Sequence, residues 1–253
     1  QVTLDDIAET VSISTGIPVT RLGADDMTMI KQMAEYIKGS IIGQDKAVEA
    51  LAKVIKRSRT GVSTEKKPTG SFMFLGPTGV GKTETVKALA EYMFGDTDAM
   101  IRIDMSEYQE KFNVSRLIGS PPGYVGHEDG GQLTEAVRRK PYSVVLFDEV
   151  EKAHPDIFNT LLQVLDEGRL TDSNGRVVDF TNTIIVMTSN VGARKLADFG
   201  TGIGFSTASS MLEEQAKMDG IIKKELKNKF SPEFLNRLDD IVLFDQLKSE
   251  DVI

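Results

Sequence analysis

Eight residues, GPTGVGKT from Gly76 to Thr83, constrain what this chain can fold into more than any other stretch. They match the pattern G-x-x-x-x-G-K-[ST], a glycine-rich turn whose backbone N–H groups surround phosphate oxygens when a strand precedes it and a helix follows. The apolar run SFMFL (71–75) lies directly before the turn, and an apolar stripe with helical spacing follows it, formed by Val86, Leu89, Ala90 and Met93. This context predicts a phosphate-binding loop at a helix N-terminus rather than a turn without a ligand.

Five short apolar runs divide the chain, and helical patterns lie between most of them. The runs are SFMFL (71–75), MIRID (100–104), SVVLF (143–147), TIIVMTS (183–189) and DIVLF (240–244). Continuous apolar strands that alternate with helices indicate a mostly parallel sheet buried on both faces. The sequence therefore predicts an α/β fold in which a five-stranded sheet is flanked by helices. We expect residues 37–253 to form this module and residues 1–36 to form a linker segment that leads into it.

Composition argues against several classes of site and location. The chain has 30 basic and 38 acidic residues, a net charge of −8 that argues against a nucleic-acid-binding surface. It has no cysteine and only two histidines, so we expect neither a disulfide nor a cysteine- or histidine-rich metal site. No apolar stretch approaches the roughly 20 residues of a membrane-spanning helix, and the start QVTLDDIAET lacks a signal-peptide pattern. We expect a cytoplasmic protein that binds neither membranes nor nucleic acid, and the missing initiator methionine suggests a piece of a longer chain.

Two acids, Asp148 and Glu149, follow the third apolar run. Acids at the carboxyl end of a strand lie where open α/β sheets bind ligands, although such a pair by itself is often only solvated. Together with the glycine-rich turn, Asp148 and the Thr83 hydroxyl are predicted to hold Mg²⁺, and Lys82 to reach the β- and γ-phosphates. A glutamate beside a metal-binding aspartate favours water as the nucleophile, so Glu149 is predicted to align or deprotonate that water. The pattern thus predicts hydrolysis of ATP.

Two polar residues near the last two apolar runs are weaker candidates. Asn190 follows the fourth run, where its amide would orient the same water or contact the γ-phosphate, or would simply form a turn. Arg237 precedes the fifth run and is either one half of a surface ion pair or a finger that stabilises charge in the transition state.

Two glycine-rich segments carry apolar residues that have no evident place in a core. GSPPGYVGHEDGG (119–131) keeps the backbone out of helix and strand, yet it carries Tyr124 near its centre. FGTGIGFSTA (199–208) places Ile203 and Phe205 among glycines, where they are poor core residues and good anchors for a partner. We expect both segments to present these side chains to other molecules, and the alternative is that they fold back onto the domain.

Six motifs in a fixed order make the sequence similar to a known family. They are IIGQDKAVEAL, GPTGVGKT, GSPPGYVG, VVLFDEVEKAHPDIFNTLLQVLDEGRLTD, TIIVMTSN and PEFLNRLD. Together they resemble the second ATPase module of Clp-family AAA+ unfoldases, and DDIAETVSISTGIPVTRL resembles the segment that leads into that module. The resemblance spans essentially the whole chain and implies the large subdomain of a P-loop AAA+ module. The family's small helical lid, with its second sensor arginine, is expected to be absent because the sequence stops at Ile253, and GAR (192–194) is interpreted as loop.

The resemblance also implies roles for individual residues. ATP would be bound by Gly76, Pro77, Thr78, Gly79, Val80, Gly81, Lys82 and Thr83, and its adenine would pack on Ile17, Pro18, Ile41 and Ile42. Mg²⁺ would lie at Thr83 and Asp148, with Glu149 as catalytic base, Asn190 as polar sensor and Arg237 as the finger that reaches a neighbouring subunit's ATP. Gly123, Tyr124, Val125 and Gly126 would line a central pore, and Gly202, Ile203, Gly204 and Phe205 would dock into a barrel peptidase.

The resemblance implies an ATP-dependent unfoldase that works as a homo-hexamer and threads unfolded or tagged client proteins through its pore. The segment 199–208 favours the ClpC type, which feeds a ClpP-like barrel peptidase, over a ClpB-type disaggregase or the ClpA type; an adaptor is a further partner of such proteins. Two other classes remain as alternatives. A nucleic-acid motor would place basic residues in the pore segment, which instead continues with His127, Glu128 and Asp129, and a scaffold without turnover would have no use for Glu149 and Arg237.

Overall fold

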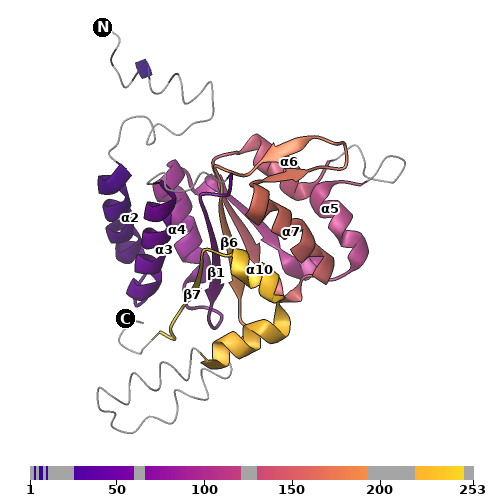
Figure 1. Cartoon of the computed structure of the whole chain (residues 1–253). Helices are drawn as coiled ribbons and strands as arrows, with labels where there is room; N and C mark the ends of the chain where they lie inside the picture. The colour runs from indigo at the N-terminus through magenta and orange to yellow at the C-terminus, as the bar shows by residue number, and fades with distance from the viewer. Residues whose placement is uncertain are drawn as a thin grey trace.

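The structure is a computed structural model that describes residues 26–59, 66–120, 130–192 and 220–247, together with residues 3, 6, 7 and 10. A central sheet runs through the molecule with helices on both of its faces (Figure 1). Within this described part of the chain, no helix has the length and apolar character needed to span a membrane.

Five parallel strands form the central sheet. They are β1 (Gly70–Leu75), β2 (Met100–Asp104), β3 (Val144–Asp148), β6 (Ile184–Ser189) and β7 (Asp240–Leu243). Their order is β2-β3-β6-β1-β7, and every neighbouring pair is parallel. Each strand coincides with one of the five apolar runs, so the predicted α/β fold with a five-stranded sheet is confirmed. Because all strands are parallel, the residues that follow β1, β3 and β6 meet at one edge of the sheet.

Successive side chains of each strand enter two separate cores. Phe72 and Phe74 of β1 belong to one core, whereas Met73 and Leu75 belong to the other. The first core is covered by α2 (Asp26–Ser40), α3 (Asp45–Arg59) and α4 (Lys82–Phe94). The second is covered by α5 (Val114–Ile118), α6 (Gln132–Arg139), α7 (Pro155–Glu167), a helix at 220–229 and α10 (Pro232–Arg237). Since both faces are buried, the inner strands β1, β3 and β6 are nearly continuous apolar runs, whereas the edge strand β2 carries the exposed Arg102.

The helices that pack on the first core bury apolar residues at helical spacing. In α3, Val48, Leu51 and Ile55 are fully buried. In α2, Ile30 and Ile37 belong to the same core, so the boundary predicted between residues 36 and 37 falls inside a packed helix. The division into a linker and a module nevertheless stays a prediction.

Glycine and proline lie at the ends of α4 and α7. The helix α4 ends at Gly95, whose left-handed backbone lets its N–H bond the carbonyl of Glu91. The helix α7 begins with Pro155, and the preceding His154 side chain accepts a hydrogen bond from the backbone N–H of Asp156. It ends at Gly168 in the same left-handed conformation as Gly95. Proline at the first turn and glycine after the last turn are the residues that commonly begin and end helices.

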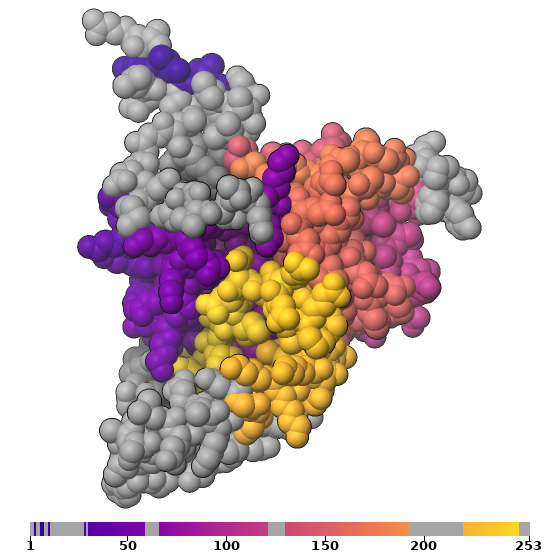
Figure 2. Space-filling view, in the orientation of Figure 1, coloured from indigo at the N-terminus to yellow at the C-terminus, as the bar shows by residue number. Residues whose placement is uncertain are grey.

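Several short elements were not predicted. They are the 3₁₀ helices η2 (Thr97–Ala99), η3 (Met105–Tyr108), η4 (Lys111–Asn113) and η5 (Val150–Lys152) and the antiparallel hairpin of β4 (Arg169–Thr171) and β5 (Val177–Asp179). On the face seen in Figure 2, the C-terminal segment drawn in yellow covers the surface between the purple N-terminal helices and the orange part of the chain. This segment includes α10, which packs against α7 through the aromatic contact of Phe234 with Phe158.

Candidate functional site

The turn that joins β1 to α4 depends on glycine at two positions. Gly81 precedes α4 with φ 98°, a left-handed conformation that glycine adopts without steric cost. At Gly76, a Cβ atom would lie 2.7 Å from the backbone oxygen of Phe244, so only a residue without a side chain allows this close approach. The turn therefore leads directly into the N-terminus of α4, whose first N–H groups carry partial positive charge.

Lys82 places a cation at the centre of this turn. Its Nζ donates hydrogen bonds to the carbonyl oxygens of Gly76 and Pro77, each at 2.6 Å. Burial lowers the pKa of the Lys82 ammonium group, while the nearby carboxylates, led by Asp148, act in the opposite direction. An anion that replaced the two carbonyl contacts would gain a charge-assisted hydrogen bond from a partly desolvated cation.

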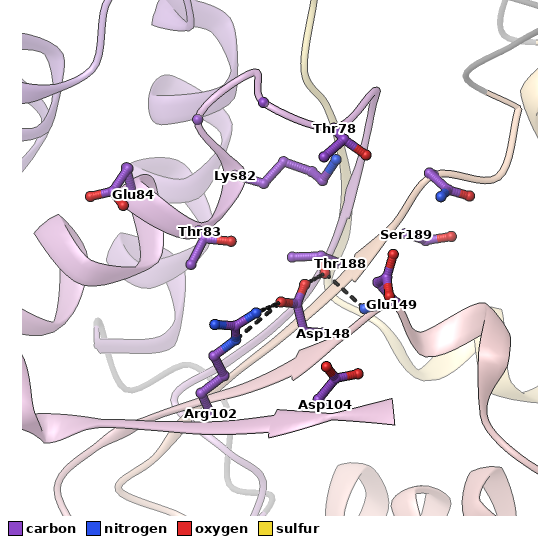
Figure 3. A pocket seen from close by; sticks show the side chains of 13 residues that line it. Thr78, Lys82, Thr83, Glu84, Arg102, Asp104, Asp148, Glu149, Thr188 and Ser189 are labelled. Atoms are coloured by element: carbon purple, nitrogen blue, oxygen red, sulfur yellow. Dashed lines mark hydrogen bonds and ion pairs between the residues drawn. The ribbon is translucent and has the colours of Figure 1, made fainter. Parts of the chain in front are cut away.

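Asp148, at the end of β3, has both carboxylate oxygens engaged (Figure 3). The buried hydroxyl of Thr188 on β6 donates to Oδ1 and in turn accepts the backbone N–H of Glu149 at 3.1 Å. Arg102 on β2 donates to Oδ2 from Nη2 at 2.6 Å and from Nε at 3.1 Å. The carboxylate is therefore oriented by the strands on both sides of β3.

Glu149 has an unusual backbone. Its φ is 54°, and among the residues that the structure describes no other non-glycine residue has a positive φ. Such a conformation is costly for a residue with a side chain and often occurs at functional sites. The Glu149 carboxylate forms an ion pair with Lys152 at 2.6 Å and remains partly exposed to the cavity.

Asn190 follows β6 and is anchored by its backbone. Its N–H donates to Oε1 of Glu151 at 3.3 Å, which leaves its own side-chain amide exposed. Glu151 is 9% exposed, and its Oε2 has no hydrogen-bond partner within the described part of the chain. A buried carboxylate thus lies beneath Asn190 and adds negative charge near Lys82.

These groups line one cavity of about 510 Å³. Its lining includes Thr78, Gly79, Gly81, Lys82, Thr83, Glu84, Arg102, Asp104, Asp148, Glu149, Thr188, Ser189 and Asn190. The cavity thus brings together part of the predicted phosphate-binding turn, both predicted metal ligands, and Glu149 and Asn190 of the predicted catalytic set. Gly76, Pro77 and Val80 belong to the same turn but do not line the cavity.

Sequence reasoning missed four of the polar groups that complete the cavity. Arg102 and Asp104 belong to the second apolar run, and Thr188 and Ser189 end the fourth. The edge-of-sheet rule that selected Asp148 also applies to Asp104, Thr188 and Ser189, since polar residues at the carboxyl ends of neighbouring parallel strands lie together. Arg102 lies inside β2 rather than at its end, so only the strand order brings its side chain to Asp148.

Other predicted residues lie elsewhere. Arg237 ends α10, where its guanidinium is 2.8 Å from Oδ1 of Asp166, and it does not line the cavity of its own chain. Ile41 is buried in the first core, and Ile42 is 60% exposed. Three sets lie outside the described residues, namely Ile17 and Pro18, Gly123 with Tyr124, Val125 and Gly126, and Gly202 with Ile203, Gly204 and Phe205.

A parallel sheet with a glycine-rich turn between its first strand and a helix, and an acid pair at the end of a nearby strand, defines the P-loop class of nucleotide-binding proteins. A family model described as AAA domain (Cdc48 subfamily) matches residues 67–241. The chain therefore belongs to the AAA domain family, and it is an ATPase module of the Clp type, as the following relatives show.

Two curated relatives illustrate the similarity. The ATP-dependent Clp protease ATP-binding subunit ClpA homolog of Guillardia theta is 55% identical over 252 residues, covering 99% of this chain and 31% of that protein. The ClpC subunit of Staphylococcus aureus strain USA300 is 57% identical over 249 residues, covering 98% of this chain and 30% of that protein. The chain thus spans less than a third of the length of these relatives.

A solved structure agrees with this assignment. A closed-state cryo-electron-microscopy reconstruction of Hsp104 with ATPγS and FITC casein matches with a TM-score of 0.80 at 40% identity, covering 99% of this chain and 42% of that chain. The resemblance to the Clp family and the P-loop AAA+ fold are therefore confirmed.

Proposed function

We propose that this chain hydrolyses ATP in the cavity described above and that the whole protein uses the hydrolysis to unfold and translocate other proteins. The observation that carries the proposal is that Lys82, at the start of α4, Asp148, at the end of β3, and Glu149, directly after it, line one cavity. This arrangement combines a cation for phosphate, an oxygen ligand for a metal and a base for water.

In this proposal, the turn at 76–83 holds the phosphates of ATP. The N-terminus of α4 favours negative charge, and Lys82 Nζ exchanges its two carbonyl contacts for phosphate oxygens. The adenine would pack near Ile41 and Ile42, which lie on the α2–α3 connection. Ile17 and Pro18 complete the predicted adenine contacts.

The cavity also suits Mg²⁺, which accompanies ATP in this proposal. Thr83 supplies a hydroxyl and Asp148 a carboxylate to the same cavity, and Mg²⁺ prefers such oxygen ligands together with phosphates and water. In the described part of the chain, no group of three acidic, histidine or cysteine side chains forms a metal site by protein ligands alone. Bound Mg²⁺ would neutralise charge on the phosphates, as in other P-loop ATPases.

Glu149 and Asn190 would act on the attacking water. Glu149 would accept a proton from that water, and its carboxylate would first have to leave its contact with Lys152, whose Nζ lies 2.6 Å from Oε2. Asn190 presents an exposed amide at the end of β6, where it lines the cavity and would orient the water or contact the γ-phosphate.

The remaining predictions concern the whole protein. We propose a homo-hexameric ring in which Arg237 reaches the neighbouring subunit's ATP and Tyr124 grips client polypeptide in the pore. The names of the curated relatives support a peptidase partner, docked by residues 202–205, and a disaggregase without such a partner is the alternative. An adaptor, the cytoplasmic location and the absence of nucleic-acid and membrane binding stay predictions.

Glu149→Gln tests the hydrolysis directly. The variant should bind ATP with nearly unchanged affinity and hydrolyse it at least about 100-fold more slowly, since it loses the base and keeps the phosphate contacts. Equilibrium binding of ATP and release of phosphate would be measured in parallel. Glu167→Gln, which removes an exposed acid paired with Arg169, is the matched control and should hydrolyse ATP normally. Normal hydrolysis by Glu149→Gln would refute the proposed role.

A further inference from the structure

Arg102 places a positive charge beside Asp148, the predicted metal ligand. No sequence motif pointed to this arginine. It lies on β2, the edge strand beside β3, and its side chain points across to Asp148 (Figure 3). In the register of the two strands, Arg102 is opposite Leu146, so its side chain extends along β3 to reach the strand's end. It lines the same cavity as Lys82 and Thr83.

The two oxygens of Asp148 differ in how firmly they are held. Oδ1 accepts from Thr188, which is 1% exposed and also bonded to the backbone of Glu149. Oδ2 accepts two N–H groups from Arg102, whose side chain is 54% exposed while that of Asp148 is 14% exposed. A cation that enters the cavity would therefore take Oδ2 by displacing the arginine rather than the threonine.

We infer that Arg102 is a resident counter-ion of Asp148 that competes with Mg²⁺ for Oδ2 and so sets the magnesium concentration at which nucleotide binds. This inference rests on the proposed nucleotide-binding function. A guanidinium with two N–H contacts satisfies the carboxylate, and its positive charge repels a divalent cation at the same oxygen. Arg102 is thus a positioning residue for the metal ligand.

The competition between Arg102 and Mg²⁺ also affects the order in which metal and nucleotide bind. Without nucleotide, a metal ion that displaced Arg102 would cost the guanidinium its two hydrogen bonds to Asp148. Phosphates bound at the turn would supply further oxygen ligands for the metal ion in the same cavity, and these ligands would offset that loss. Metal alone should therefore bind weakly, and metal with nucleotide should bind well.

The test removes the competing charge and keeps the length of the side chain. Arg102→Met is compared with Arg169→Met, which removes the same charge from an exposed ion pair with Glu167 on the hairpin side of the molecule. Binding of methylanthraniloyl-ADP is followed by fluorescence anisotropy as Mg²⁺ is raised. Half-maximal promotion of binding should need about tenfold less Mg²⁺ in Arg102→Met, the change expected for one lost charge-assisted contact. It should be unchanged in Arg169→Met and intermediate or unchanged in Arg102→Lys, which keeps the charge.

A second measurement needs no nucleotide. Binding of Mn²⁺ alone, followed by electron paramagnetic resonance, should be tighter in Arg102→Met than in the unaltered chain. An unchanged magnesium requirement together with unchanged Mn²⁺ binding would overturn the inference. So would weaker binding of the ADP analogue by Arg102→Met without Mg²⁺, because Arg102 would then be a phosphate ligand. Failure of the unaltered chain to bind the analogue at all would refute the proposed function instead, and the Mn²⁺ comparison would then decide the role of Arg102.

Discussion

Thr188 shows how a residue of ordinary chemistry controls the geometry of its neighbours. Its hydroxyl accepts the backbone N–H of Glu149 and donates to Asp148, so one buried oxygen fixes both acids. The contact to the backbone also holds Glu149 in its left-handed conformation. The two acids are therefore positioned from β6, a strand 40 residues away from Asp148 in sequence.

Replacing Thr188 with valine should disturb both acids while keeping the shape of the side chain. Thr188→Val leaves the N–H of Glu149 and one oxygen of Asp148 without this partner, which should lower the free energy of unfolding by about 1–3 kcal/mol. Hydrolysis of ATP should fall as well, because the acids lose their fixed positions. Urea unfolding and phosphate release measure the two effects. Thr188→Ser keeps the hydroxyl and should retain most of the activity, and equal losses in both variants would contradict this role.

Elements distant in sequence are joined at the glycine-rich turn by Gln44. This residue directly precedes α3 and is 3% exposed. Its Nε2 donates to the carbonyl oxygens of Val80 at 3.2 Å and Asp245 at 2.9 Å, and its Oε1 accepts the N–H of Asp245 at 3.1 Å. One side chain therefore ties the start of α3 and the segment after β7 to the turn.

We expect Gln44→Met to loosen the turn. The variant keeps the length of the side chain and leaves up to three backbone groups without this partner, so the free energy of unfolding should fall by about 1–3 kcal/mol. Nucleotide affinity should fall because the turn is less well ordered before binding. Urea unfolding and anisotropy of a fluorescent nucleotide test these effects. Gln109→Met, which removes an exposed hydrogen bond to Ser106, should change the free energy of unfolding by less than about 0.5 kcal/mol.

Sequence patterns predicted the elements whose signals are local. The five strands, the apolar stripe of α4 and the glycine-rich turn each depend on residues within a short window. Arg102 was not predicted because its contact with Asp148 depends on strand order, which places β2 beside β3 only in the folded sheet. The hairpin of β4 and β5 had a local signal, Asn174–Gly175 between two short runs, that went unused.

At the scale of the whole molecule, the position of Arg237 is consistent with two roles, one within its own chain and one at a neighbouring subunit. Within its own chain it contacts Asp166 of α7 and stays away from the cavity, with 42% of its side chain exposed. Either this ion pair attaches α10 to α7, or the exposed guanidinium serves the ATP of a neighbouring subunit. Exposed ion pairs contribute little to stability, so the first role alone would have a small effect.

Arg237→Ala should leave ATP binding nearly intact and reduce hydrolysis in the assembled ring at least about tenfold. Asp166→Asn breaks the same ion pair but keeps the arginine, so it should hydrolyse ATP normally. Mixing Arg237→Ala subunits with Lys82→Ala subunits should restore part of the activity, since each supplies what the other lacks. Phosphate release from mixed rings of known composition measures this. Equal losses in Arg237→Ala and Asp166→Asn, or no recovery in mixed rings, would contradict action between subunits.

The backbone of Glu149 means that a variant without the proposed catalytic base can be the better folded one. Its left-handed conformation is strained for glutamate and free of steric cost for glycine. Glu149→Gly should therefore raise the free energy of unfolding by roughly 0.5–1 kcal/mol while it removes the base. A library selected only for solubility or heat resistance would enrich this substitution and discard catalysis unnoticed. Any attempt to engineer a more robust form of the protein has to score hydrolysis at every round.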